Sequence, residues 1–384
     1  MKINEGYILR NLHGVHYLLP IGQNLALHKK SIKLNHTSAL LWNAICQGIE
    51  EDELLPYLLN HLEEPDPDME AIRNDIACFL EQLSALHLIL PESASSCNRK
   101  LQIGNIIIGY HGPDILLSPS LLSFTCSEGE VKQHWHIESH SPDTFSKGEL
   151  LIRSHDLEIQ KSHEYYTLTF FPASQLISAK ISLDGTQAYF YCSPPFDQAL
   201  TEKLFHAFRF GFLIYAQQHG LFALHSASIL YKNQAWLFAA ASGTGKSTHA
   251  QLWQHHYRTP IINGDLNLLG FANSNPVVYG LPWCGTSNMY STQTYPLGGI
   301  ILLKQGCKNI VQELSRDNQQ LQVMQRLINP VWTEQMADVN LEFSGKLSKQ
   351  THIFQFLCTK EAAAATMLKK KIDELVHHTK GTAL

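Results

Sequence analysis

The sequence predicts a multi-domain α/β protein, and three observations lead to this fold class. Residues 1–92 show short alternating apolar runs followed by three helical patterns. Residues 101–192 are β-rich, with strand-like runs separated by clusters of Gly, Pro, Ser and Asp. From residue 196 onward, helices and strands alternate around a glycine-containing loop. A length of 384 residues is enough for two or three domains, which we place at residues 1–92, 100–195 and 196–384.

Residues 1–92 have the pattern of one small α/β domain. Alternating runs at 7–9, 15–19 and 31–34 are broken by turn residues and predict three short strands. Helical patterns follow from Asn35 to Gly48 and around residues 54–62, where Pro56 fits only in the first turn. A third helix, capped by Asp66 or Asp68 and ending near residue 86, is the clearest of the three. Its apolar face consists of Met69, Ile72, Ile76, Phe79, Leu80 and Leu83. Residues 91–96 resemble a linker.

The remaining residues predict a β layer followed by alternating strands and helices. Strand-like runs lie at 103–109, 149–153, 165–171 and 188–192, and they favour an antiparallel layer. A strong helical pattern spans residues 196–218 and stops at Gly220. Helices are expected after Gly245 and over residues 361–376. Strands are expected at residues 222–231, 235–240, 260–263, 297–303 and 352–357.

Composition excludes several classes of function. The 29 Lys and Arg against 34 Asp and Glu give a net charge of −5, so no basic surface for nucleic acid is expected. The most apolar stretch, residues 210–216, is too short to span a bilayer. The N-terminus has no secretory signal pattern, and we therefore expect a cytoplasmic protein without membrane contact. The eight cysteines form no Cys-x-x-Cys pair and the 21 histidines show no metal-ligand spacing, so reduced thiols and no histidine-bound zinc are expected.

The most informative segment is residues 236–248, in which an apolar strand runs into a glycine loop and a helix start. In such a loop, backbone N–H groups and the helix N-terminus surround phosphate groups. Lys246 would reach the β- and γ-phosphate oxygens, and the Ser247 hydroxyl would bind Mg²⁺. Ala240 stands where the usual first glycine would be. The predicted nucleotide-binding residues are Ser242, Gly243, Thr244, Gly245, Lys246, Ser247 and Thr248.

Two flanking residues strengthen this prediction. His225 lies on the preceding strand, which a tight turn joins to the loop strand, so its side chain could lie beside the phosphates. Asp265 follows an apolar strand, where loops of this kind need a second group to orient Mg²⁺. Taken singly, His225 could be a buried structural histidine and Asp265 a turn residue.

The order of His225, the glycine loop and Asp265 resembles the HPr kinase/phosphorylase family and its relative, ATP-dependent phosphoenolpyruvate carboxykinase. The likeness covers residues 200–375 and rests on Ser242-Gly243-Thr244-Gly245-Lys246, on a Leu-His-Ser-Ala string around His225, and on Asp265. It implies a P-loop kinase core. It further implies that Lys246 and Ser247 bind phosphate and Mg²⁺, that Asp265 binds Mg²⁺, and that His225 contacts the γ-phosphate.

One departure from that family concerns the general base. The first acid of the family's Asp-Asp pair, which takes the acceptor proton, is Gly264 here. Asp265, His225 or His249 could serve instead, although His249 could equally be a solvent-facing residue. Because phosphoryl transfer depends mostly on positioning and charge neutralisation, the missing acid need not abolish it.

Residues 279–287 resemble a loop of HPr-kinase-like proteins from peptide-modification clusters. The loop is either part of the acceptor site or a packed turn with Trp283 in the core. Cys284 is not expected to be a nucleophile, because no activating partner is visible in the sequence.

Residues 1–92 resemble PqqD-like peptide-recognition domains, which have a winged-helix-like fold and capture the leader of a precursor peptide. The resemblance rests on the segment 33–42, the acidic start of the second helix and residues 75–86. It implies that a leader adds as a strand beside residues 31–34, with its apolar side chains against the third helix. The predicted contacts are Ser31, Ile32, Lys33, Leu34, Ile72 and Ile76. With six basic and thirteen acidic residues in this range, DNA binding is not expected.

These observations predict a cytoplasmic kinase that uses ATP or GTP with Mg²⁺ and phosphorylates a Ser or Thr of a docked precursor peptide. A small-molecule kinase with a regulatory N-terminal domain and a nucleotide-gated, non-catalytic peptide carrier are the alternatives. The sequence identifies neither the nucleotide nor the acceptor residue, and an oligomer is possible.

Overall fold

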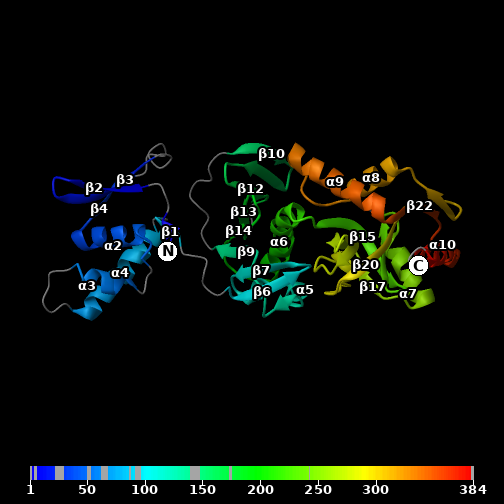
Figure 1. Ribbon diagram of the computed structural model, residues 1–384, viewed down its shortest axis with the longest axis horizontal. Helices are drawn as coiled ribbons and strands as arrows, with labels where there is room; N and C mark the ends of the chain where they lie inside the picture. The colour runs from blue at the N-terminus through cyan, green and yellow to red at the C-terminus, as the bar shows by residue number, and fades with distance from the viewer. Residues whose placement is uncertain are drawn as a thin grey trace. The chain divides into compact units, whose positions relative to one another are not determined.

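The computed structural model is a mixed α/β protein with several β-sheets (Figure 1). It describes residues 2–3, 7–21, 30–49, 53–61, 68–85, 88–90, 97–138, 148–172, 175–241 and 243–381. The chain divides into two compact units, residues 1–96 and 97–384. None of the helices in the described ranges combines the length and the apolar character needed to cross a bilayer.

The first unit contains a three-stranded antiparallel sheet in the order β2-β3-β4. The strands are β2 (Tyr7–Leu12), β3 (Val15–Pro20) and β4 (Ile32–Leu34), close to the three runs predicted. His13 and Gly14 adopt φ of 53° and 83°, which makes the tight turn between β2 and β3. A short pair, β1 (Lys2–Ile3) with β5 (Ile89–Leu90), joins the two ends of this unit.

The three predicted helices of this unit are confirmed. They are α2 (His36–Cys46), α3 (Leu54–Leu59) and α4 (Met69–Ala85). The Asn35 side chain accepts from the Ser38 N–H at 2.7 Å and Asp68 accepts from the Glu70 N–H at 3.0 Å, so both helices begin at side-chain caps. Pro56 lies in the first turn of α3, as expected. Asp66, the end of the third helix near residue 86 and the linker at 91–96 lie outside the described residues.

The second unit begins with a nine-stranded sheet in the order β10-β11-β12-β13-β14-β9-β7-β6-β8. The strands are β6 (Arg99–Ile103), β7 (Ile106–His111), β8 (Thr125–Cys126), β9 (Gln133–Glu138), β10 (Glu149–Arg153), β11 (Leu157–Lys161), β12 (Tyr165–Phe170), β13 (Leu176–Ser182) and β14 (Gln187–Cys192). The predicted antiparallel layer is wrong at β9, which runs parallel to both β14 and β7. Parallel neighbours need long connections, and here β10–β13 separate β9 from β14 along the chain.

A long helix covers one face of this sheet. The helix, α6 (Gln198–Gln218), begins at the Asp197 cap and agrees with the predicted span apart from its first two residues. Its Phe208 ring stacks on Trp135 of β9, with centroids 4.8 Å apart, and meets Phe190 of β14 edge to face. Two short turns, η2 (Asp114–Leu116) and α5 (Pro119–Leu122), join β7 to β8.

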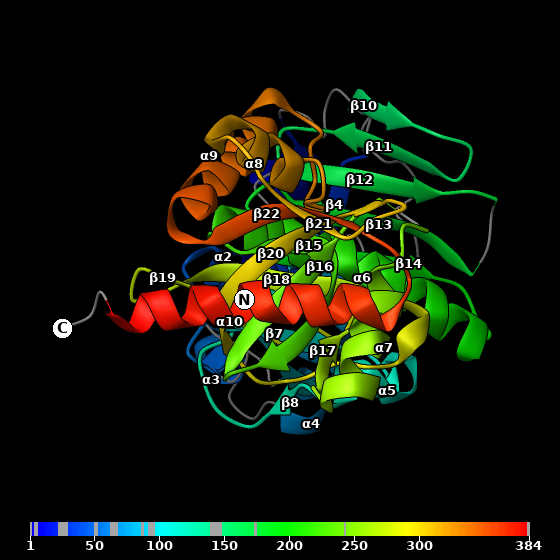
Figure 2. The ribbon, with the colours of Figure 1, turned by 90° about the vertical axis from the view of Figure 1, so that its right-hand side faces the viewer.

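The rest of the second unit is an eight-stranded mixed sheet between helices. Its strands are β15 (Phe222–Tyr231), β16 (Gln234–Ala239), β17 (Ile261–Asn263), β18 (Leu266–Ala272), β19 (Asn275–Tyr279), β20 (Tyr295–Gln305), β21 (Ile310–Glu313) and β22 (His352–Cys358). Its helices are α7 (Lys246–Tyr257), α8 (Arg316–Met324), α9 (Glu334–Gln350) and α10 (Ala362–Gly381), with a short turn η3 (Gly285–Ser287). Figure 2 shows α8 and α9 on one side of the strands and α7 and α10 on the other.

Two apolar clusters hold this sheet between its helices. On one face, Leu237 and Ile300 pack with Phe343 of α9. On the other face, Trp236 and Ile301 pack with Trp253 of α7. Because β16 pairs in parallel with β20 and antiparallel with β15, the strand that leads into the glycine loop is held on both edges.

Candidate functional site

The glycine loop joins the end of β16, at Ala239, to the start of α7, at Lys246. Gly243 and Gly245 have φ of 75° and 112°, a left-handed region that residues with side chains rarely adopt. Gly245 is the N-cap of α7, and among the residues that the structure describes no side chain caps the helix there. The first N–H groups of α7 are therefore available to an anion, as the predicted phosphate loop requires.

Lys246 is the first residue of α7, and its side chain is buried against the loop. Its relative exposure is 8%, and Nζ donates to the Ala240 carbonyl at 3.3 Å. Burial lowers the pKa of Lys246, Asp265 opposes that shift, and the charge of Arg326 adds to it. Ser247 is exposed and Thr248 half-buried, while Ser242 lies outside the described residues.

His225 and Asp265, which are 40 positions apart in the sequence, lie side by side with their side chains in contact. His225 lies on β15 and Asp265 between β17 and β18, and His225 Nε2 is 3.2 Å from Asp265 Oδ1. The hydrogen bond from His225 lowers the pKa of Asp265, and the charges of Lys246 and Arg209 act in the same direction. Asp265 is therefore held as a carboxylate. The structure thus brings the three predicted catalytic residues, His225, Lys246 and Asp265, into one electrostatic cluster.

Two arginines belong to this cluster that the sequence analysis did not identify. Arg209, on α6, is half-buried; burial lowers its pKa and the charge of Asp265 opposes the shift. Arg326 follows α8, and its backbone carbonyl accepts from the His225 N–H at 2.9 Å. Its side chain donates from Nη1 to the Gln322 carbonyl, whereas its Nε is buried without a hydrogen-bond partner in the described part of the chain. The signal in the sequence was weak: Arg209 stands between two phenylalanines inside an apolar helix.

The local backbone fixes where the Asp265 carboxylate lies. The Asn263 side chain accepts from the Asp265 N–H at 2.9 Å and donates to the Leu281 carbonyl at 3.0 Å. The Ser226 N–H donates to the Asp265 carbonyl oxygen at 2.9 Å. Asn263 is 2% exposed, so the turn that carries Asp265 is tied to its neighbours by buried hydrogen bonds.

Gly264 has no room for the acid that the resembled family carries at this position. A Cβ there would lie 2.1 Å from Ser287 Oγ and 2.4 Å from Ser287 Cβ. The Ser287 hydroxyl is in turn fixed by donating to the Cys284 carbonyl at 2.6 Å. The space that an acid would need is therefore filled by the segment around η3.

His249 is neither a base nor a solvent-facing residue, so both interpretations of it are wrong. It is 1% exposed and its ring lies 6.0 Å from Phe238 and 6.1 Å from Phe356. This burial lowers its pKa to about 4. His225 and Asp265 remain as candidate bases.

Residues 279–287 pack into the core and also reach Asp265. Trp283 is 2% exposed and donates from Nε1 to the Phe205 carbonyl at 2.7 Å, which confirms the packed turn. A Cβ on Gly285 would lie 2.9 Å from Asp265 Cβ, so the backbone of this loop contacts the candidate metal ligand. Burial raises the pKa of the Cys284 thiol, which agrees with its rejection as a nucleophile.

The predicted peptide contacts lie around an edge strand of the first unit. Within the described residues β4 pairs only with β3, so its outer edge can accept another strand. Ser31 and Lys33 are exposed, and Ile32 and Ile72 are half-buried. Leu34 and Ile76 are 7% and 6% exposed and belong to the core, so their side chains offer little surface to a peptide.

No protein-family model matches the chain, and no curated protein matches it either. Among solved structures, it resembles "TbiB1 in Complex with the TbiA(beta) Leader Peptide" at 18% identity, over 25% of this chain and 100% of that one, with a TM-score of 0.20. It also resembles the "Hpr(Ser) kinase/phosphatase from Coxiella burnetii" at 13% identity, over 24% of this chain and 64% of that one, with a TM-score of 0.19. Each likeness covers about a quarter of the chain.

Proposed function

We propose that this chain is a cytoplasmic, ATP-dependent kinase that docks a precursor peptide on residues 1–92 and phosphorylates a Ser or Thr hydroxyl of that peptide. The observation that carries the proposal is a cluster of basic side chains: His225, Lys246 and Arg209 act on the Asp265 carboxylate, and the charge of Arg326 acts on Lys246. The cluster lies where a helix N-terminus is left uncapped. A polyphosphate chelating a divalent cation has the charge pattern that such a cluster complements.

The donor set fits Mg²⁺. Ser247 offers a hydroxyl and Asp265 a carboxylate, and Mg²⁺ prefers oxygen ligands. Because the pKa of Asp265 is lowered, this ligand stays ionised at neutral pH. Bound Mg²⁺ would neutralise charge on the β- and γ-phosphates.

The protein's own residues would position and neutralise the reacting groups. Lys246 and the two arginines would bind phosphoryl oxygens, on which negative charge is spread in the transition state. The acceptor hydroxyl oxygen attacks the γ-phosphorus, the bond to the β,γ-bridging oxygen breaks, and the nucleoside diphosphate leaves. His225, oriented by the 3.2 Å contact of its Nε2 with Asp265, would take the hydroxyl proton on its other ring nitrogen, Nδ1, because the low pKa of Asp265 makes that carboxylate a weak base.

Docking would occur through the free edge of β4. A leader segment that pairs with Ile32 and Lys33 gains main-chain hydrogen bonds, and Ile72 on α4 offers apolar surface to its side chains. Tethering raises the effective concentration of the acceptor at the second unit, so a weak acceptor site is enough.

The test is transfer to the precursor peptide. Incubation with ATP and Mg²⁺ should add a phosphoryl group, about 80 Da, to the peptide in mass spectra. Lys246→Ala should abolish the addition, whereas Lys308→Ala, at an exposed lysine, should not. A wild-type chain that binds nucleotide and peptide but never transfers phosphate would refute the kinase.

One observation favours a second candidate, a nucleotide-gated peptide carrier. Ser287 leaves no room for an acid at Gly264, so the chain lacks the residue that takes the proton in the resembled family. A carrier would bind peptide in a nucleotide-dependent way without consuming nucleotide. Measuring ATP consumption with and without peptide separates the two.

A further inference from the structure

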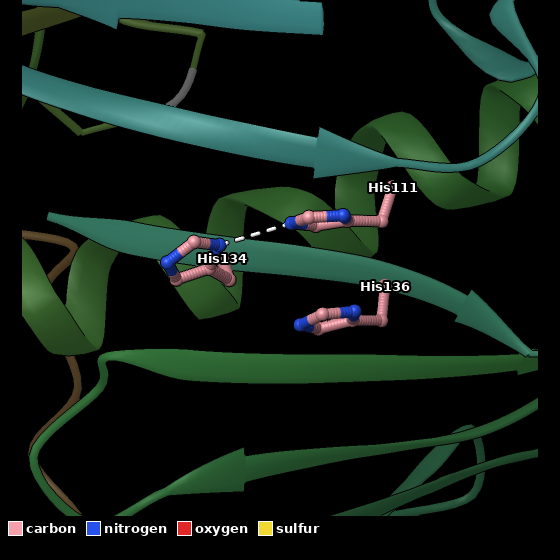
Figure 3. A group of neighbouring side chains, drawn as sticks. All are labelled: His111, His134 and His136. Atoms are coloured by element: carbon pink, nitrogen blue, oxygen red, sulfur yellow. Dashed lines mark hydrogen bonds between the residues drawn. The ribbon is translucent and has the colours of Figure 1, made fainter. Parts of the chain in front are cut away.

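Three histidines lie together on the nine-stranded sheet, on the face opposite α6 (Figure 3). His111 ends β7, and His134 and His136 belong to β9, which runs parallel to it. In the register of the two strands His111 is the partner of His136, and Gly109 is the partner of His134. Trp135 between the two β9 histidines is fully buried against Phe208 of α6, so its neighbours point to the other face.

The three imidazoles are close enough to share one ion. One ligand nitrogen from each lies within 4.8 Å of those of the other two. His111 Nε2 and His134 Nδ1 are 2.9 Å apart, and the His111 and His136 rings stack with centroids 4.4 Å apart and an 8° angle between planes. Gly109 makes this approach possible, because a Cβ there would lie 3.1 Å from His134 Nδ1.

Gln187 and Tyr189 hold the His136 ring in place, as the groups behind metal-binding histidines commonly do. His136 Nε2 is 3.0 Å from Gln187 Oε1, and in the tautomer that donates to this acceptor the lone pair lies on Nδ1. Histidines that bind metals regularly donate their second N–H to such a partner. The Tyr189 ring stacks on His136 at 4.7 Å and limits its rotation.

We propose that His111, His134 and His136 bind a divalent transition-metal ion, and that Zn²⁺ fits the site best. Three imidazoles suit borderline metals, and Zn²⁺ accepts three protein nitrogens with a fourth, open position for water. A metal lies in the plane of the ring that binds it, so the His111 ring must turn about χ2, a broad torsion, away from its stack on His136, which Tyr189 and Gln187 hold in place. The ion then replaces the hydrogen bond between His111 and His134.

The site is distinct from the proposed kinase centre and can be tested without activity. The full-length chain, freed of metal with a chelator, is titrated with ZnCl₂ by calorimetry. We expect one site that His134→Ala and His136→Ala each weaken at least tenfold, and that Gln187→Ala weakens about tenfold by releasing His136. His155→Ala, which removes a histidine whose side chain is 94% exposed, should leave the titration unchanged. Equal stoichiometry and affinity in wild type and in His134→Ala would overturn the proposal.

A measurement on the unaltered chain covers the case in which the variants misfold. X-ray absorption at the zinc edge of the protein loaded with one equivalent of Zn²⁺ should show a shell of nitrogen and oxygen only, with the outer scattering of three imidazoles. A sulfur shell would place the zinc on the cysteines, and a shell without imidazole scattering would place it elsewhere. Either result refutes the three-histidine site.

Discussion

Asp265 is surrounded by basic groups, and in the proposed kinase its charge would decide which form of the nucleotide binds. Its carboxylate repels a bare triphosphate and attracts one that carries a cation. Replacing Asp265 by Asn removes that repulsion but also removes a proposed metal ligand. We therefore expect Asp265→Asn to bind ATP about tenfold more tightly when Mg²⁺ is absent, to gain little from added Mg²⁺, and to transfer no phosphate.

Fluorescent ATP titrations with and without Mg²⁺ measure this change. Asp338→Asn, at an exposed position on α9, is the control and should retain the wild-type dependence on Mg²⁺. If Asp265→Asn instead binds ATP more weakly in both conditions, the carboxylate has a structural role and is not a metal ligand.

Position 264 must be glycine because Ser287 leaves no room for a side chain there, and a double-mutant cycle can test this. Gly264→Ala drives a Cβ into Ser287, and overpacking of this kind costs about 1–3 kcal/mol in the free energy of unfolding. Ser287→Gly removes the clashing atoms, so the two changes together should cost less than their sum by about 1 kcal/mol or more. Denaturant unfolding of the four proteins gives the cycle, and additive costs would show that Ser287 is not the obstacle.

His249 should make the stability of the second unit depend on pH. Burial lowers its pKa from 6.5 to about 4, so between these values the unfolded chain binds a proton that the folded one does not. Stability is therefore full above about pH 6.5 and declines as the pH falls toward 4. The expected loss from about pH 7.5 to about pH 5 is about 2 kcal/mol.

Unfolding curves at these two pH values test the prediction. In His249→Phe the decline should be smaller by this amount, because a ring of similar size fills the space without titrating. His255→Gln, at an exposed position on the same helix, should decline like the wild type. An unchanged decline in His249→Phe would mean that other groups cause it.

At the scale of elements, local patterns were predictable and long-range ones were not. The strand, loop and helix around Lys246 follow from a contiguous string, and so do the caps at Asn35 and Asp68. Helix α9 was missed because its buried face includes Asn340, Ser344 and Ser348, which blur the apolar period. The parallel pairing of β9 with β14 and β7 was not predicted either, because no local pattern indicates which distant strands become neighbours.

In the candidate site, too, the residues within one contiguous segment were predictable, and those brought together by packing were not. Lys246 and its loop are recognisable because their chemistry is contiguous in the sequence. Arg209 and Arg326 join it only through the packing of α6 and the segment after α8, 117 positions apart. The histidine cluster was not predicted because β9 was not, and only on a strand do His134 and His136 share a face.

The edge of β4 can be tested by its hydrogen bonds. Along an antiparallel strand, the N–H groups of consecutive residues point to opposite sides. Of Ile32→Pro and Lys33→Pro, one should therefore remove an outward N–H and abolish leader binding, and the other should disturb the pairing with β3. Circular dichroism identifies the folded variant, and calorimetry with the leader measures its binding. Lys33→Ala keeps the N–H and should bind normally. If neither proline variant loses binding, the leader does not pair with β4.

At the scale of the whole molecule, the two units have separate cores, and the proposed reaction needs only that they stay tethered. Among the described residues, one apolar cluster lies in the first unit and three others lie in the second. Residues 97–384 alone should therefore fold and bind ATP. Toward the precursor peptide we expect an unchanged kcat and a KM raised at least a hundredfold, because docking no longer concentrates the acceptor.

Steady-state kinetics of the full chain and of residues 97–384 distinguish the peptide kinase from the small-molecule kinase and from the carrier. Residues 1–96 added as a separate chain should not restore the KM, since the gain comes from the covalent link. A matched experiment uses a core peptide without its leader, which should have the same high KM with both proteins. If truncation leaves the KM for the true acceptor unchanged, the first unit is regulatory and the acceptor is a small molecule. If neither protein transfers phosphate, the chain is a carrier.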